Sequence, residues 1–173
     1  MNYFELYNLP ISFHPNQNEV KKQFYALSKK YHPDFYINES AEKQDEVLEL
    51  ATLNNKAFQV LKNPQKVLQY VLALKEMITE GENYTLPQSF LMEMMDVNEA
   101  IMDLQIDFDA AKLAQVNNEI GHIEQSLNDN LQLYTEEFEN ANAAEQQASL
   151  AKIKDCYYRS KYIHRLKERL ATF

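Results

Sequence analysis

The sequence predicts an all-α fold, and three observations support this prediction. Only two glycines and five prolines occur among 173 residues, so tight turns and glycine-rich loops are scarce. Residues that favour helices are abundant. Apolar residues recur at spacings of three and four in both halves of the chain. With 45% apolar and 25% charged residues, the composition is that of an ordinary globular protein and not of a disordered chain.

The charge distribution divides the chain into two parts. Residues 1–75 contain nine lysines and eight acidic residues, whereas residues 76–173 contain eight basic and eighteen acidic residues, so the formal balances are +1 and −10. The change coincides with a segment that holds Gly81 and Pro87 and interrupts the helical pattern. The predicted division is a domain over 1–75, a linker over 76–88 and an acidic domain over 89–173.

The first domain is expected to begin with two helices. Residues 3–7 form a short aromatic helix that ends before Pro10, because proline disfavours helical geometry in the residue that precedes it. A longer helix from about residue 18 to 31 has one apolar stripe, which includes Val20 and Phe24. The opposite side and its edges carry four basic residues: Lys21, Lys22, Lys29 and Lys30.

Two more helices complete this domain. Ser40 can cap a long helix whose apolar pattern runs from Val47 to Leu61. Asn63 followed by Pro64 is a second start signal, because asparagine caps a helix and proline suits its first turn.

Three longer helices are predicted for the acidic domain. Their apolar stripes include Phe90, Met94, Val97, Ile101 and Leu104 in the first, Leu113 to Phe138 in the second and Ile153 to Leu170 in the third. The breaks at 107–109 and 139–142 are short, which favours antiparallel neighbours. We therefore expect an up-down-up three-helix bundle.

The sharpest motif is His32-Pro33-Asp34, which lies between the lysine-rich helix and the long helix that follows. Together with the short aromatic helix before them, these elements resemble the J-domain, the module by which co-chaperones engage DnaK-type chaperones. Proline stiffens such a loop, so its histidine and aspartate can act as fixed polar contacts for a partner. The resemblance implies a chaperone-binding site formed by His32, Pro33, Asp34, Lys21, Lys22, Lys29 and Lys30. Phe35 departs from the pattern, because many J-domains have a lysine there.

Two further segments narrow the resemblance. The N-terminal run from Asn2 to Pro10 and the run from Ser89 to Glu99 are both similar to HscB, and the likeness spans essentially the whole chain. HscB proteins are J-type co-chaperones that present the iron–sulfur scaffold protein IscU to the DnaK-type chaperone HscA and stimulate its ATP hydrolysis. The resemblance therefore implies HscA and IscU as partners and a bacterial type of HscB.

The resemblance also implies which residues bind the scaffold. The positions that match the family's surface are Leu91, Met92, Met95, Asp96, Glu99, Asp103 and, on the last helix, Tyr158. The first six follow helical spacing, so they can share one broad face that combines flexible apolar contacts with an acidic rim. Such a face suits a basic, mobile client.

Other kinds of site are not indicated. A single cysteine, Cys156, cannot form an internal disulfide or a Cys-x-x-Cys zinc site. Glu119 and His122 have a di-iron spacing, but a second such pair is absent. Two glycines cannot build a nucleotide-binding loop, so we expect no enzyme activity, no cofactor and no metal, with ATP hydrolysed by the partner.

The remaining expectations concern location and alternatives. No apolar run approaches the roughly 18 residues of a membrane span, so a cytoplasmic protein without membrane contact is expected. The acidic domain repels phosphates, which argues against nucleic acid. Two alternatives stay open: a J-domain adaptor for a different client protein, and a metal-storing helical bundle.

Overall fold

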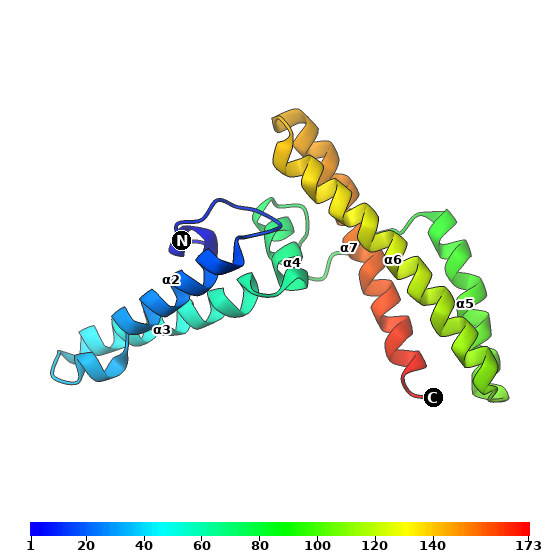
Figure 1. Ribbon diagram of the computed structural model, residues 1–173, viewed down its shortest axis with the longest axis horizontal. Helices are drawn as coiled ribbons and strands as arrows, with labels where there is room; N and C mark the ends of the chain where they lie inside the picture. The colour runs from blue at the N-terminus through cyan, green and yellow to red at the C-terminus, as the bar shows by residue number, and fades with distance from the viewer. The chain divides into compact units, whose positions relative to one another are not determined.

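The computed structural model describes residues 1–173 and confirms the all-α prediction, since every regular element is a helix. The chain forms two compact units, Met1–Lys75 and Glu76–Phe173 (Figure 1).

Five helical elements make up the first unit. They are α1 (Tyr3–Leu6), α2 (Gln17–Lys30), the 3-10 helix η1 (Pro33–Tyr36), α3 (Ala41–Leu61) and α4 (Pro64–Leu74). Helices α2 and α3 pack against each other as an antiparallel pair, with η1 in the connection between them (Figure 1). The loop that contains η1 therefore lies at one end of the α2–α3 pair.

The predicted helix starts in this unit are confirmed by their capping geometry. The Ser40 hydroxyl accepts a hydrogen bond from the backbone N–H of Lys43 at the start of α3. The Asn63 side chain accepts from the N–H groups of Gln65 and Lys66, while Pro64 occupies the first turn of α4. Both caps satisfy backbone donors that a helix start otherwise leaves unpaired.

A buried amide joins three parts of the first unit. Asn54 of α3 is 1% exposed, and its Oδ1 accepts a hydrogen bond of 2.8 Å from the hydroxyl of Tyr7. Its Nδ2 donates to the carbonyl oxygen of Phe24 and to the hydroxyl of Ser28, at 3.1 and 3.0 Å. Tyr7 is also fully buried, and this burial raises the pKa of its phenol well above the ordinary value. The network ties α2 and the residue after α1 to α3.

Aromatic stacking adds to this core. The rings of Phe24 and Phe58 stack with centroids 4.1 Å apart, which joins α2 to α3. The ring of Tyr3 stacks on Tyr70 at 4.6 Å, and the Tyr70 hydroxyl accepts from the Tyr3 backbone N–H. Helix α1 is therefore held at one end by α3 and at the other by α4.

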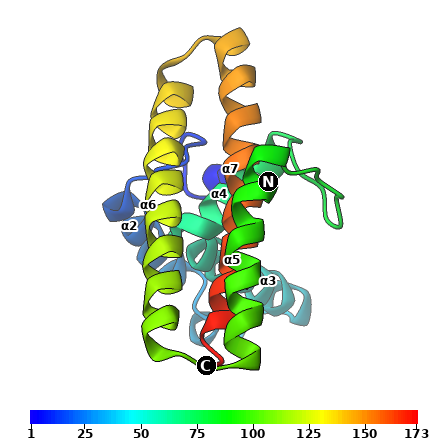
Figure 2. The ribbon, with the colours of Figure 1, turned by 90° about the vertical axis from the view of Figure 1, so that its right-hand side faces the viewer.

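The second unit is the predicted bundle of three helices, α5 (Gln88–Ile106), α6 (Ala110–Asn140) and α7 (Ala143–Leu170). Figure 2 shows α6 and α7 as a long hairpin, with the shorter α5 lying along part of it. Asp109 and Asn142 cap α6 and α7 at the two short connections. The buried side of α5 consists of the five residues that the periodicity predicts, Phe90, Met94, Val97, Ile101 and Leu104.

We predict that replacing Asn54 by alanine lowers the free energy of unfolding by about 2–3 kcal/mol, because a buried cavity forms and buried groups lose hydrogen-bond partners. Urea denaturation followed by circular dichroism measures this loss. The matched control is Asn55→Ala, which changes an exposed asparagine of the same helix. Equal stability of the two variants would contradict a structural role for the Asn54 amide.

Candidate functional site

The His32-Pro33-Asp34 segment is a locally ordered loop. His32 caps η1, and its Nδ1 accepts a hydrogen bond of 3.4 Å from the backbone N–H of Asp34. The Phe35 N–H donates to the His32 carbonyl oxygen at 3.1 Å, and Pro33 occupies the first turn of η1. These bonds and the fixed φ of proline reduce the conformational freedom of the loop.

The neighbouring helices hold this loop from both sides. From the η1 side, the hydroxyl of Tyr36 donates to the carbonyl oxygen of Lys30 in α2 at 2.8 Å. From α3, the Gln44 amide donates to the carbonyl oxygens of Ile37 and Glu39 at 3.1 and 3.0 Å. The loop is thus fastened to α2 and α3, the same pair that Asn54 joins.

The polar groups of the loop face solvent. The side chains of His32 and Asp34 are 54% and 77% exposed. Nδ1 of His32 is engaged with Asp34, since it accepts the Asp34 N–H and lies 3.7 Å from Oδ2 of Asp34, so Nε2 is the ring nitrogen that a partner would meet. Phe35, 68% exposed, places its ring 5.7 Å from that of His32 and adds an apolar group to this surface.

The lysine-rich side of α2 is exposed as well. All four predicted residues, Lys21, Lys22, Lys29 and Lys30, lie at the surface. Lys22 forms an ion pair with Glu19 at 3.4 Å, which offsets part of its charge.

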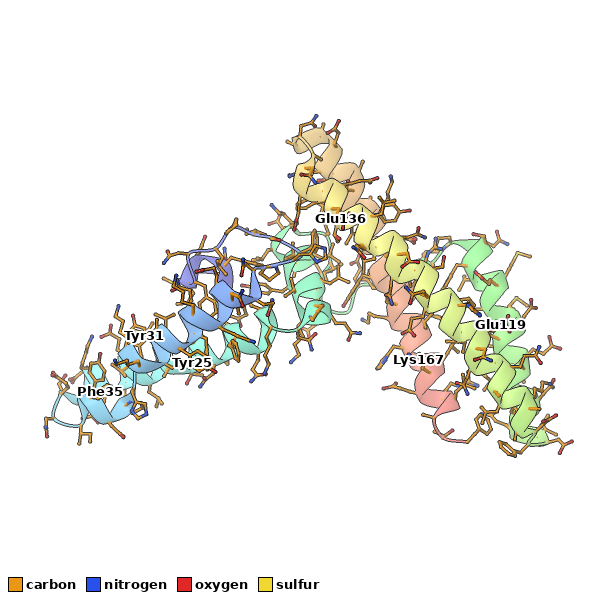
Figure 3. The ribbon with its side chains drawn as sticks, in the orientation of Figure 1. Tyr25, Tyr31, Phe35, Glu119, Glu136 and Lys167 are labelled. Atoms are coloured by element: carbon orange, nitrogen blue, oxygen red, sulfur yellow. The ribbon has the colours of Figure 1, made fainter.

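One exposed residue on this side of α2, Tyr25, was not predicted from the sequence. Tyr25 of α2 is 66% exposed (Figure 3). At about 100° per residue, its position on the helix falls between those of Lys21 and Lys29. The same helical arithmetic that located the lysines could have found it. The candidate chaperone-binding surface therefore combines positive charge with two aromatic rings, those of Tyr25 and Phe35.

On α5, the candidate scaffold-binding residues lie outside the core. Leu91, Met92 and Met95 are 39%, 61% and 67% exposed, although each is a large apolar residue. Asp96 and Glu99 are exposed beside them. Packing in the core of the bundle therefore does not explain why Leu91, Met92 and Met95 are apolar.

Asp103 differs from the other acidic residues of this face. It is exposed, but its Oδ2 accepts a hydrogen bond of 2.6 Å from Nζ of Lys112, near the start of α6. Part of its charge is neutralised within the protein.

Tyr158 of α7 has contacts that the sequence does not indicate. It is partly buried, its hydroxyl donates to Oε2 of Glu82 at 2.8 Å, and its ring stacks on Tyr84 at 4.4 Å. Burial and the Glu82 carboxylate raise the pKa of Tyr158 to about 12. The hydrogen bonds from Lys154 and Tyr158 in turn lower the pKa of Glu82. The segment expected to be a linker is thus attached to α7.

The tyrosine one turn later is the one that contacts α5. The ring of Tyr162 meets Phe90 edge-on at 5.8 Å, and its hydroxyl lies 2.8 Å from the Nδ2 donor of Asn98. The structure therefore brings Leu91, Met92, Met95 and the acidic residues together on α5, whereas Tyr158 has its contacts with Glu82 and Tyr84.

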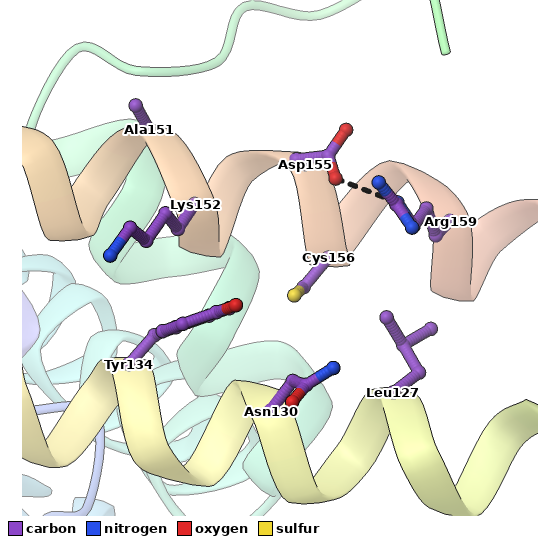
Figure 4. Close-up of a pocket in the computed structure, with 8 residues that line it drawn as sticks. All are labelled: Leu127, Asn130, Tyr134, Ala151, Lys152, Asp155, Cys156 and Arg159. Carbon is purple, nitrogen blue, oxygen red and sulfur yellow. Dashed lines mark ion pairs between the residues drawn. The ribbon is translucent and has the colours of Figure 1, made fainter. Parts of the chain in front are cut away.

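An open cavity of about 330 Å³ lies between α6 and α7 (Figure 4). Cys156 lines it, and burial raises the pKa of this thiol to about 11. On its rim, Nε of Arg159 and Oδ2 of Asp155 are 2.6 Å apart. A thiol that stays protonated at neutral pH is a weak nucleophile and a weak metal ligand.

No group of three or more histidine, cysteine, aspartate or glutamate side chains is arranged to hold a metal ion. None of the helices combines the length and the apolar character needed to cross a bilayer.

Two family models match the chain, one in each unit. Residues 2–70 match the DnaJ domain. Residues 86–171 match the HSCB C-terminal oligomerisation domain. The first match contains the His32-Pro33-Asp34 loop and the lysine-rich helix, and the second contains the whole three-helix bundle.

Curated relatives match over most of their length. The co-chaperone protein HscB homolog of Vibrio parahaemolyticus is 33% identical over 141 residues, which cover 76% of this chain and 82% of the relative. That of Photobacterium profundum is 32% identical over 138 residues, covering 74% and 81%.

Solved structures show the same architecture. The crystal structure of the human co-chaperone protein HscB has a TM-score of 0.72 at 22% identity, covering 99% of this chain and 81% of the other. The chaperone HscB from Vibrio cholerae has a TM-score of 0.64 at 26% identity, covering 97% and 96%. Because family models match both units and curated relatives match over most of their length, the chain belongs to the HscB family of J-type co-chaperones.

Proposed function

We propose that this protein binds the iron–sulfur scaffold IscU and presents it to the DnaK-type chaperone HscA, whose ATP hydrolysis it stimulates. In this role the first unit contacts the chaperone and the second unit holds the scaffold. The observation that carries the proposal is that one chain of the HscB family exposes two chemically different surfaces, a polar loop beside lysines in the first unit and an apolar face with an acidic edge in the second.

The geometry of the first unit supports contact with a chaperone. His32 and Asp34 are held by backbone hydrogen bonds, so little conformational entropy is lost when a partner binds them. The lysines of α2 supply positive charge beside the loop, which favours an acidic surface on the chaperone and speeds encounter.

The geometry of α5 supports binding of a protein client. Exposed methionines adapt their shape to a partner, because the thioether chain is unbranched and flexible. Here Met92 and Met95 lie next to Asp96 and Glu99, all at the surface. An apolar patch with an acidic edge favours a client that offers apolar side chains together with lysine or arginine.

In this proposal, the presence of both surfaces on one chain brings the client to the chaperone. A client bound to the second unit is present at a high effective concentration when the first unit engages the chaperone. The defining experiment is therefore steady-state ATP hydrolysis by HscA with this protein, with IscU and with both. Synergy between the two is the expected result, whereas stimulation without synergy would favour a J-domain adaptor for a different client.

We predict that His32→Gln abolishes stimulation of the HscA ATPase but leaves IscU binding unchanged. Glutamine keeps the side chain polar but lacks the imidazole geometry that caps η1 and faces the partner. ATPase assays and calorimetric titration of IscU measure the two effects. The matched control, His122→Gln, changes an exposed histidine of α6 and should alter neither quantity. Full ATPase stimulation by His32→Gln would contradict the assigned role, whereas loss of both activities would indicate a folding defect.

The combined replacement of Leu91, Met92 and Met95 by alanine should weaken IscU binding by at least about ten-fold, since truncating central contacts of an interface commonly costs more than 1 kcal/mol each. Basal stimulation of HscA without IscU should remain. Calorimetry gives the dissociation constant, and Leu133→Ala, at an exposed leucine of α6, serves as the control. An unchanged dissociation constant would rule out this face as the scaffold site.

A further inference from the structure

The exposed apolar side chains of α5 continue well beyond the proposed scaffold-binding residues. Met102 is 57% exposed and Ile106 is 85% exposed, in the last two turns of the helix. The apolar exposure does not end with the helix, because Phe108 is 56% exposed and its ring lies 6.4 Å from that of Phe173. None of these side chains belongs to the core of the bundle.

Helical geometry places the five apolar side chains of α5 on one strip. At about 100° per residue, Leu91, Met92, Met95, Met102 and Ile106 fall within an arc of roughly 100° on the side opposite the buried residues. We call these five residues the apolar strip. From Leu91 to Ile106 it is about 22 Å long, of which about 16 Å lies beyond Met95.

A row of acidic residues runs beside the apolar strip. Asp96, Glu99 and Asp103 are exposed and follow α5 at spacings of three and four, and the exposed Asp107 comes directly after the helix. Lys112 offsets part of the charge of Asp103 only. By the same arithmetic the acidic residues lie mainly along one edge of the strip, so charge is placed asymmetrically about it. A complementary partner would therefore have a row of apolar side chains with lysine or arginine along one side only.

We propose that Met102 and Ile106 extend the scaffold-binding site, so that one basic amphipathic segment of the client lies along the whole apolar strip. This inference rests on the proposed function, since it names further contacts of the same site. Continuity with Leu91, Met92 and Met95 supports it, and so does the acidic row, which continues past the strip's midpoint to Asp107.

The acidic row also argues for a basic client over two other occupants. A second copy of this chain packed through α5 would add a second row of carboxylates and no basic side chain, since α5 contains neither lysine nor arginine. An anionic lipid surface would be repelled by the balance of −10 over residues 76–173. The site therefore fits a partner of opposite charge.

We expect Met102→Ala combined with Ile106→Ala, in the full chain, to weaken IscU binding about ten-fold in a calorimetric titration. The thermal melting temperature should not change, because both side chains are exposed. Leu133→Ala is again the control. If this pair leaves the dissociation constant unchanged while the Leu91, Met92 and Met95 replacement raises it, the extension is wrong but the proposed function stands. If neither changes binding, α5 is not the scaffold-binding site and the extension fails with it, whereas the absence of any IscU binding by the unsubstituted protein would overturn the proposed function.

Charge substitutions test the chemistry of the client separately from apolar contact. Met102→Lys should bind IscU more weakly than Met102→Glu at low salt, and the difference should shrink as salt rises. Leu133→Lys and Leu133→Glu, at an exposed site on α6, report the effect of net charge alone. If the lysine and glutamate variants differ in IscU binding by the same amount at Leu133 as at Met102, the client makes no local basic contact with the strip. Sedimentation tests the remaining occupant. If the protein dimerises and Met102→Ala with Ile106→Ala abolishes the dimer, the apolar strip binds a second copy instead.

Discussion

The first unit depends on one buried amide. Asn54 has one acceptor oxygen and two donor hydrogens, and it engages them with the Tyr7 hydroxyl, the Phe24 carbonyl and the Ser28 hydroxyl. Apolar contacts tolerate sliding between helices, whereas hydrogen bonds at a buried site require one register. The network therefore fixes how α2 lies along α3. Because the His32-Pro33-Asp34 loop connects these two helices, its position follows from that register.

The two candidate surfaces arise in different ways. In the first unit, a proline-containing loop displays polar side chains that backbone hydrogen bonds hold in place. In the second unit, a single helix presents one side to the core and the other to solvent. The buried side of α5 stabilises the bundle, so its exposed side is free to vary with the partner. A protein with few glycines can thus build binding sites without long flexible loops.

Much of this structure follows from sequence periodicity. The stripe from Phe90 to Leu104 identifies the core side of α5 because burial repeats with the helical turn, and Ser40 and Asn63 mark helix starts through local hydrogen bonds. Contacts between distant residues leave no such pattern. Tyr158 and Glu82 are 76 positions apart, so their hydrogen bond could not be predicted from spacing. Neither could the partners of Asn54, which lie on other parts of the first unit, at positions 7, 24 and 28.

The apolar strip has a chemical consequence of its own. Three of the six methionines, Met92, Met95 and Met102, lie on it with more than half of each side chain exposed. Exposed thioethers are oxidised to sulfoxides, which are polar and chiral, and dedicated reductases reverse the reaction. Oxidation would turn the strip from apolar to polar without disturbing the buried core. Under the proposed function, this oxidation would weaken client binding while the folded bundle persists.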